Sequence, residues 1–390
     1  MIQTFAILYD AYRRLRANAI FYVVLGISLL VVAVFALIGV DEEGIHFLKW
    51  TWPERTTPEE FYLGVFNAYG VQVWLTWVAA ILALISTAFI FPGLIKGGSV
   101  SMVLSKPISR LRLFLTQYVA GLMFVFVQVG LFCIAGFLVL GLRGGVWSWK
   151  VFLAVPIVLL MFSYLYSVLV LLGVWTRSTV ASLLLTLVFW FVLFAAVSTQ
   201  TFMMSQEVVM RDRARRYEQA IGMVEADIRR WEDRQDPPSP ATPATEPAAG
   251  QRRFTVRRRP PILGLSPAAS LEETRKVLAL ARQRWEAMRK EGKSYGEIAD
   301  MIDRLRGPLP KTSETSNLLT RYVSDQQMRS DITGFSVYSD PTPEEERQWG
   351  MAVASLKVYG GSWWELVGSS LAFEVVMVAL AAWVFCRRDY

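Results

Sequence analysis

Few side chains in this sequence could do chemistry, and they are not clustered. The one histidine, His46, has no nearby set of carboxylates or cysteines that would complete a metal site or a catalytic triad. The two cysteines, Cys133 and Cys386, both lie in apolar stretches, which argues against a disulfide framework. The sequence contains neither a G-x-x-x-x-G-K-[ST] phosphate loop nor an H-E-x-x-H zinc motif. We therefore expect a chain that is not an enzyme and that holds no cofactor or metal of its own.

Glu374 is the acidic side chain with the most unusual surroundings. It lies well inside the apolar stretch Trp363–Cys386, and a charge at bilayer depth costs roughly 2.5–3.5 kcal/mol on insertion scales. It should therefore face neighbouring helices rather than lipid, and Ser370, one helical turn earlier, shares its face. Two interpretations remain open. Glu374 is either a carboxyl group that is hydrogen-bonded to a neighbouring helix and holds the bundle together, or a gate or path residue.

The elements that would position Glu374 are long stretches of apolar residues. About 20 such residues can cross a bilayer as a helix, and lipid offers no partner to any other backbone conformation. Six stretches meet this length: Asn18–Val40, Val71–Ile95, Leu113–Leu142, Val151–Trp175, Val180–Phe202 and Trp363–Cys386. The sequence therefore predicts an all-α, polytopic membrane protein with six transmembrane helices.

The distribution of charge predicts how these helices are oriented. Basic residues favour the cytoplasmic side, and they gather before the first stretch, between the second and third, and after the last. The loop Asp41–Gly70, in contrast, is rich in acidic residues. We expect a protein of the plasma (inner) membrane with both termini cytoplasmic. The net charge of +7 is explained largely by these basic flanks, so we expect contact with membrane lipid and not with nucleic acid.

A charged segment, residues 203–360, separates the fifth apolar stretch from the sixth and should be extracytoplasmic. It contains two stripes of residues with the four-and-three spacing of a coiled-coil seam. The first stripe is Met210, Ala214, Tyr217, Ile221, Val224, Ile228 and Trp231, and the second is Leu271, Thr274, Leu278, Ala281, Trp285 and Met288. The two stripes predict a helical, coiled-coil-like hairpin inserted between spans five and six.

Local signals mark the ends of the helices in this insert. Ser270 and Glu273 form a predicted capping box at the start of the second stripe. A third, separate short helix is expected from Ser294 to Arg306. The linker 236–250 is too rich in proline, alanine and threonine to build a packed core. The expected division of the chain is thus 1–202, a membrane region; 203–360, the insert; and 361–390, the sixth span with its cytoplasmic tail.

The cytoplasmic loop 96–112, KGGSVSMVLSKPISRLR, carries the most informative motif. Pro107 forces a turn because it cannot continue a helix, and Ser109 can cap the helix that follows. The segment Leu104–Arg110, LSKPISR, resembles the L-S-(R/K)-P-(I/V)-S-R element of permeases in the type-2 family of ATP-binding-cassette (ABC) exporters. The ending WVFCRRDY and the element Leu309-Pro310-Lys311 are also similar to motifs of that family.

The resemblance implies partners for this loop. In such permeases it is a coupling helix that fits a groove on a separate ATPase subunit, which holds the ATP and Mg. The residues expected at that interface are Val100, Met102, Val103, Leu104, Lys106, Pro107 and Arg110. The resemblance also implies pairing with a second permease copy or a homologous permease. The insert departs from the family's pattern and could serve an extracytoplasmic partner.

Two functions therefore compete at the level of the sequence. The first is a permease subunit of an ABC exporter-like complex, which moves a substrate across the membrane with ATP hydrolysed by a separate subunit. The alternative is an ATPase-driven membrane scaffold or mechanical transmitter, which acts on an extracytoplasmic partner without transport. A polar path at the seam of the dimer would favour transport, whereas a closed apolar seam with a stiff hairpin would favour the transmitter.

Overall fold

The computed structural model describes residues 19–41, 44–47, 50–52, 57–96, 109–233, 256, 260–266, 269–323 and 334–387. Contacts within the chain divide it into two compact units. Unit 1 comprises Met1–Ala196, Arg306–Met328 and Gly361–Tyr390, and unit 2 comprises Val197–Leu305 and Arg329–Gly360. Residues 306–328, which we expected within the inserted block, thus group with unit 1.

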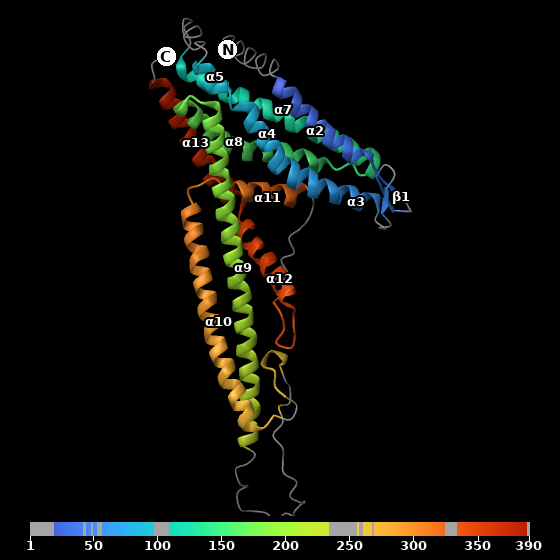
Figure 1. Ribbon diagram of the computed structural model, residues 1–390, viewed down its shortest axis with the longest axis vertical. Helices are drawn as coiled ribbons and strands as arrows, with labels where there is room; N and C mark the ends of the chain where they lie inside the picture. Colours follow the sequence, from blue (N-terminus) through green and yellow to red (C-terminus); the bar gives the residue numbers. More distant parts are fainter. Residues whose placement is uncertain are drawn as a thin grey trace, which may run out of the picture. The chain divides into compact units, whose positions relative to one another are not determined.

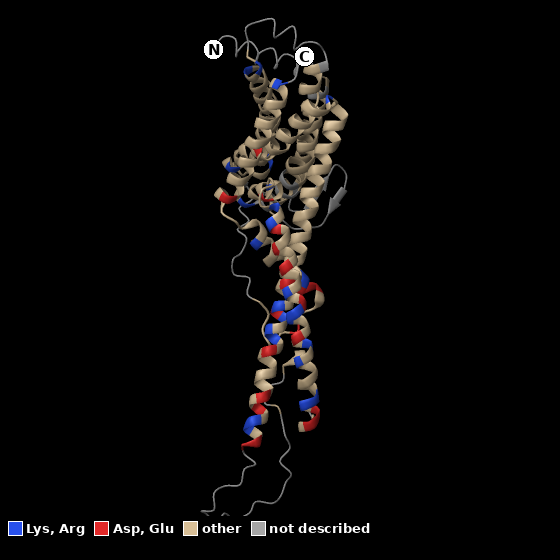
Figure 2. Ribbon diagram, turned by 90° about the vertical axis from the view of Figure 1, so that its left-hand side faces the viewer, with Lys and Arg blue, Asp and Glu red and all other residues tan. Residues whose placement is uncertain are grey.

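Unit 1 is built mainly of helices (Figure 1). In chain order they are α2 (Ala19–Leu37), α3 (Pro58–Val65), the π-helix η1 (Phe66–Val78), α4 (Ala79–Thr87), α5 (Ile90–Lys96), α7 (Arg110–Gly144), the 3-10 helix η2 (Trp149–Leu153), α8 (Ala154–Thr176), the first part of α9 (Thr179–Glu232), α11 (Thr312–Val323) and α13 (Trp363–Arg387). Apart from α3 and α11, their sequences are strongly apolar, and Figure 2 shows few charged residues along the apolar helices.

Three short strands follow α2 and form an antiparallel sheet in the order β1-β2-β3. They are β1 (Ile38–Asp41), β2 (Gly44–Phe47) and β3 (Trp50–Trp52). Ile45 pairs with Val40 on one side and with Trp52 on the other. Such β-branched and aromatic residues favour strands, although the acidic loop around them gave no such signal in the sequence. The fold is therefore predominantly helical rather than wholly α.

Within the described residues, five helical segments are long and apolar enough to cross a membrane: Val73–Ile95, Arg110–Gly144, Trp149–Thr176, Thr179–Glu232 and Trp363–Arg387. They correspond to five of the six predicted stretches. In α2, which corresponds to the first, the apolar helix is shorter and covers Tyr22–Leu37. Five helices of this length and composition indicate a membrane protein.

The core of unit 1 centres on α8, which packs against α7, α11 and α13. Large side chains such as Tyr166 are fully buried there. The ring of Tyr118 on α7 stacks on the ring of Tyr166, with their centroids 5.0 Å apart. This close approach depends on Gly121, because a Cβ atom at that position would lie 2.2 Å from the Tyr166 hydroxyl oxygen. The glycine thus lets α7 and α8 meet closely around Tyr118.

Unit 2 contains the remainder of α9, together with α10 (Leu271–Arg306), the 3-10 helix η3 (Pro261–Leu263) and α12 (Pro343–Tyr359). α9 and α10 lie side by side and antiparallel (Figure 1). Their direction follows from three contacts between side chains: Glu232 with Arg275 at 2.7 Å, Glu225 with Arg282 at 2.6 Å, and Gln200 with Asp303 at 3.0 Å. Both helices carry charged residues of both signs along their length (Figure 2).

Both predicted apolar stripes contribute to one buried cluster. Its members on α9 and α10 include Ile221, Val224, Ile228, Leu278 and Ala281. The cluster also contains residues from outside the two helices, namely Val256, Leu263 and Val337. Other segments of the chain therefore cover the two stripes, in addition to the contacts between the stripes themselves. This arrangement differs from a coiled-coil seam formed by two helices alone.

The predicted capping box is confirmed, and the predicted separate helix is wrong. The backbone N–H of Ser270 donates to Glu273 Oε2 at 2.8 Å, and the Glu273 N–H donates to Ser270 Oγ at 3.2 Å. α10 then continues unbroken to Arg306, and Ser294 donates its hydroxyl back to the carbonyl of Lys290 instead of capping a new helix.

Two glycines, Gly292 and Gly296, lie on either side of Ser294 inside α10. A Cβ atom on Gly292 would lie 3.2 Å from the Cβ of Met210, and one on Gly296 would lie 3.0 Å from Glu207 Cδ. Both glycines therefore mark places where α10 approaches α9 closely, which is a common reason for glycine inside a helix. They do not end the helix.

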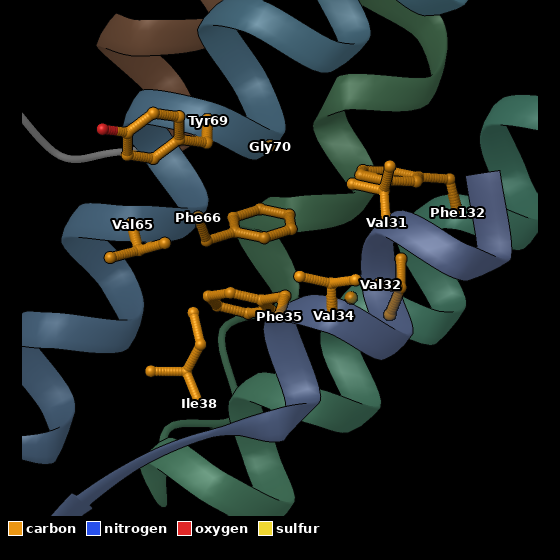
Figure 3. Close-up of a pocket in the computed structure, with 11 residues that line it drawn as sticks. Val31, Val32, Val34, Phe35, Ile38, Val65, Phe66, Tyr69, Gly70 and Phe132 are labelled. Atoms are coloured by element: carbon orange, nitrogen blue, oxygen red, sulfur yellow. The ribbon is translucent and has the colours of Figure 1, made fainter. Parts of the chain in front are cut away.

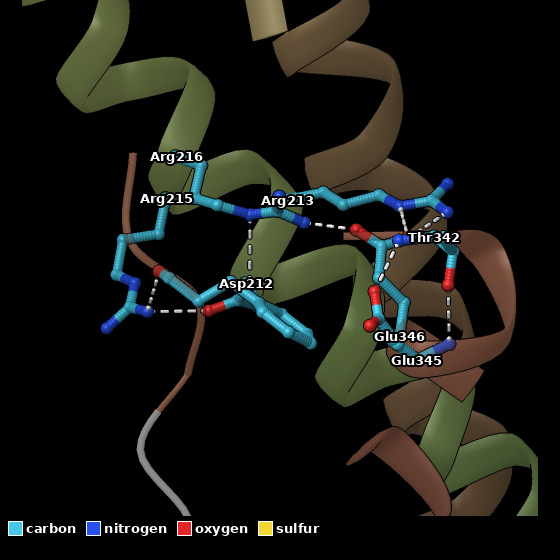
Figure 4. Close-up of polar contacts among 8 residues, drawn as sticks. Asp212, Arg213, Arg215, Arg216, Thr342, Glu345 and Glu346 are labelled. Carbon is cyan, nitrogen blue, oxygen red and sulfur yellow. Dashed lines mark hydrogen bonds and ion pairs between the residues drawn. The ribbon is translucent and has the colours of Figure 1, made fainter. Parts of the chain in front are cut away.

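A buried ion network joins α12 to α9 within unit 2 (Figure 4). Glu346 of α12 accepts a hydrogen bond from Arg213 Nε at 2.7 Å, and it also pairs with the guanidinium of Arg216. Arg216 in turn pairs with Asp212 at 3.1 Å. The side chains of Arg216 and Glu346 are only 3% and 7% exposed, so each charge depends on its partners. A capping box at Thr342 and Glu345 starts α12 beside this network.

Low pH is expected to loosen α12 from α9. Burial of the Glu346 carboxyl by itself raises its pKa, but the hydrogen bonds and charges of Arg213 and Arg216 outweigh burial and hold the pKa below its usual range. Because the folded-state pKa is the lower one, the stabilisation is complete above the ordinary carboxyl pKa of about 4.3 and is lost as pH falls through the folded value. Amide exchange of α12, corrected for the intrinsic rate, should stay constant down to about pH 5 and rise below that. A loss of protection already between about pH 7 and pH 5 would contradict this assignment.

Candidate functional site

Glu374 is held by side chains from two other helices of unit 1. Its Oε1 accepts a hydrogen bond from the Tyr118 hydroxyl of α7 at 2.8 Å. Its Oε2 lies 2.8 Å from the Ser163 hydroxyl of α8. Tyr118 and Ser163 are buried, and Glu374 itself is partly buried. The structure thus places Glu374 against neighbouring helices, where the cost of a charge in lipid led us to expect it.

The Ser163 hydroxyl has two acceptors within reach but only one proton to donate. Besides Glu374 Oε2, the carbonyl oxygen of Leu160 lies 2.8 Å away. Tyr118 likewise has a second, longer contact, 3.4 Å from its hydroxyl to the Ser163 carbonyl. The carboxyl group can therefore leave this site without stranding the Ser163 hydroxyl in an apolar surrounding. We call Glu374, Tyr118 and Ser163 the carboxylate cluster.

Ser370, the second predicted polar residue of α13, makes a different contact. It is fully buried, donates to the Leu366 carbonyl at 2.8 Å and accepts from the backbone N–H of Lys311 at 2.9 Å. Lys311 immediately precedes α11, which is fastened again at Glu314 by a buried ion pair with Arg306. Ser370 and Glu374 therefore face different partners: one anchors the start of α11, and the other contacts α7 and α8.

The loop motif lies mostly outside the described residues. This is so for six of the seven residues expected to contact an ATPase: Val100, Met102, Val103, Leu104, Lys106 and Pro107. The helix that follows the loop begins as predicted, because Ser109 Oγ accepts from the N–H of Arg112 at 3.4 Å and caps α7.

Arg110, the seventh residue, has a structural contact that the sequence did not suggest. Its Nη1 donates to the carbonyl oxygen of Cys386, at the end of α13, at 3.1 Å. A cation at the last turn of a helix also complements the helix dipole. The start of α7 is thereby tied to the end of α13. Arg110 therefore has an intramolecular role to be separated from any contact with an ATPase.

The carboxylate cluster thus joins α7, α8 and α13 by hydrogen bonds. Among the described residues, no group of three or more His, Cys, Asp or Glu side chains could hold a metal ion. Comparison of the chain with protein-family models, with curated proteins and with solved structures finds no match.

Proposed function

We propose that this protein is the membrane-spanning permease subunit of an ABC exporter-like complex, moving a substrate with ATP hydrolysed by a separate ATPase subunit. The observation that carries the proposal is a continuous set of contacts in unit 1. α7 begins directly after the loop that resembles a coupling helix, Arg110 ties that beginning to the end of α13, and α13 carries Glu374. The loop and the carboxylate cluster are thus mechanically connected through two helices.

In this proposal, closure of the ATPase pair displaces the loop and with it the start of α7. Arg110 passes the displacement to α13, and the bonds of Glu374 to Tyr118 and Ser163 break as α13 shifts against α7 and α8. The second acceptor of Ser163 lowers the cost of that step. A carboxylate released within the bundle would then face the path between two permease copies.

A second candidate, the mechanical transmitter, is favoured by α9. This helix runs unbroken for 54 residues, and its apolar first third belongs to unit 1 whereas the longer remainder, with its charged end, belongs to unit 2. The network around Glu346 ties the part in unit 2 to α12, which precedes α13 in the chain by a few residues. An element of this kind could carry a displacement along its length to an extracytoplasmic partner. Both functions require the separate ATPase, and only the first requires a substrate to cross.

The loop and its neighbour Arg110 can be tested separately in the complex with the ATPase. Replacing Lys106-Pro107 with Ala-Ala should uncouple ATP hydrolysis, since proline sets the angle of the turn. Arg110→Ala should also uncouple it but should in addition raise amide exchange in the last turn of α13. Arg112→Ala, an exposed residue of the same turn, serves as the control. If coupling is unchanged in both test variants, the loop does not couple the ATPase to this protein.

The proposed topology has six spans, both termini cytoplasmic and the insert 203–360 extracytoplasmic. Cysteines introduced at Ser239 and Ser266, in a chain with Cys133→Ala and Cys386→Ala, should react with a membrane-impermeant reagent in intact cells. A cysteine at Arg388 should react only after lysis. The reverse pattern would turn the insert into a cytoplasmic docking domain and would contradict the proposed arrangement.

A further inference from the structure

Unit 1 contains an apolar cavity of about 300 Å³ between α2, the junction of α3 with η1, and α7 (Figure 3). Its walls include Val31, Phe35 and Ile38 from α2 and the start of β1, Phe66 from η1, and Phe132 from α7. The lining is almost entirely hydrocarbon. The cavity is about twice as large as an engineered apolar cavity of ~150 Å³ that binds benzene.

The Phe66 ring holds one wall of this cavity in place. It stacks with Phe132 at 6.4 Å between centroids and packs against Phe35 at 6.2 Å. Two glycines give it room: a Cβ atom on Gly136 would lie 2.7 Å from the ring, and one on Gly70 would lie 3.1 Å from it. Phe66 also begins the π-helix η1, a type of segment that is frequent at functional sites. The cavity is therefore a feature of the packing of these helices.

We propose that the cavity binds one acyl chain of a membrane lipid. In a bilayer, hydrocarbon surrounds the apolar helices that form it, so a chain can enter without any cost of dehydration. A flexible hydrocarbon chain that occupies a space of this kind gains dispersion contacts with its lining. Water would lack the two to four polar partners that it needs, and a charged ligand would have no group to pair with.

The rim of the cavity indicates where the lipid headgroup lies. Ile38 lines the cavity and begins β1, and Tyr69 lines it while remaining 67% exposed. Tyrosine is enriched at the membrane–water interface, where its hydroxyl meets the headgroups. The acyl chain therefore enters from the end of α2 that adjoins the sheet, with its headgroup at the level of β1.

Photo-crosslinking can test this proposal on the full chain. The protein would be reconstituted in phosphatidylcholine vesicles that contain phosphatidylcholine with a photoactivatable diazirine in its acyl chain, and labelled peptides would be identified by mass spectrometry. We expect labelling of Phe66 and Phe132. Val31→Phe, which fills the cavity, should lower this labelling roughly tenfold, equivalent to ~1.4 kcal/mol of lost packing. Val65→Phe fills it from the opposite wall and should do the same if Val31→Phe fails to fold.

The matched control is Leu30→Phe, because Leu30 neighbours Val31 on α2 but is 63% exposed. It should leave labelling in the cavity unchanged, and peptides around the exposed Phe191 of α9 report labelling by the surrounding annular lipid. The proposal is overturned, and the contact is annular lipid only, if Phe66 and Phe132 are labelled no more than Phe191. The same conclusion follows if labelling of Phe66 and Phe132 is equal in the Val31→Phe and Leu30→Phe variants. Neither outcome depends on ATPase coupling.

Discussion

Replacing Glu346 with glutamine is expected to destabilise the attachment of α12 to α9 by about 3 kcal/mol. The amide can still accept a hydrogen bond from Arg213, but it removes the negative charge beside Arg216, whose side chain is 3% exposed. Asp212, which lies 3.1 Å from Arg216, still compensates part of the buried positive charge. We therefore expect an effect at the lower end of the range for a broken buried ion pair. Amide exchange of α12 should accelerate by about 100-fold if opening of this helix is local.

Glu344→Gln is the matched control for this prediction. Glu344 lies on the same helix and pairs with Arg347 at 3.3 Å, but the two side chains are 58% and 70% exposed. A pair exposed to this degree contributes little, so we expect a change within about 0.5 kcal/mol. Equal exchange rates in the Glu346 and Glu344 variants would show that the network does not hold α12.

Replacing Glu374 with glutamine is expected to leave the protein folded and assembled but to lower ATP-driven function roughly tenfold. The amide oxygen can still accept from Tyr118, and the Ser163 hydroxyl can turn to the Leu160 carbonyl. What is lost is the charge that the released side chain would present to the path in the proposed function, and this loss is the reason for the lower ATP-driven function. Stimulation of the partner ATPase in vesicles, measured beside the wild type, gives the readout.

Two further variants separate the gate from a merely structural carboxyl group. Glu365→Gln makes the same chemical change at the exposed start of α13 and should have no effect. Glu374→Ala removes both acceptors and should also cost about 1 kcal/mol in stability, as for other hydrogen bonds between membrane helices. If Glu374→Gln works as well as the wild type while Glu374→Ala is unstable, the charge has no functional role and the structural interpretation stands.

The sequence could place Glu374 but not its partners. The cost of a charge in lipid requires only that the residue face other helices, and this can be read from one stretch of the chain. Tyr118 and Ser163 lie 256 and 211 residues away along the chain, so only the packing of α7 and α8 against α13 brings them to Glu374. The polar residues inside the apolar stretches were the one signal that could have suggested them.

Two helix starts predicted from local signals in unit 2 had different outcomes. The capping box at Ser270 is set by hydrogen bonds over three residues, and it forms as predicted. The separate helix predicted from Ser294 does not form, and the glycines on either side of it, Gly292 and Gly296, lie close to Met210 and Glu207 of α9. Arg216 lies outside the predicted apolar stripe of α9, yet its side chain is buried and pairs with Glu346 of α12. These differences arise from contacts between segments that the sequence alone does not pair.

The central claim, that this chain works as the membrane subunit of a separate ABC-type ATPase, is tested most directly by measuring ATP hydrolysis with and without that partner. The full chain, isolated from its native membrane under mild conditions, should carry an ABC-type ATPase at equal stoichiometry. The complex should hydrolyse ATP, and the Ala-Ala variant at Lys106-Pro107 should lose coupling while remaining inserted. The chain purified alone should show no hydrolysis above background. Stoichiometric turnover by the lone chain, or a native complex without any ATPase, would contradict the account.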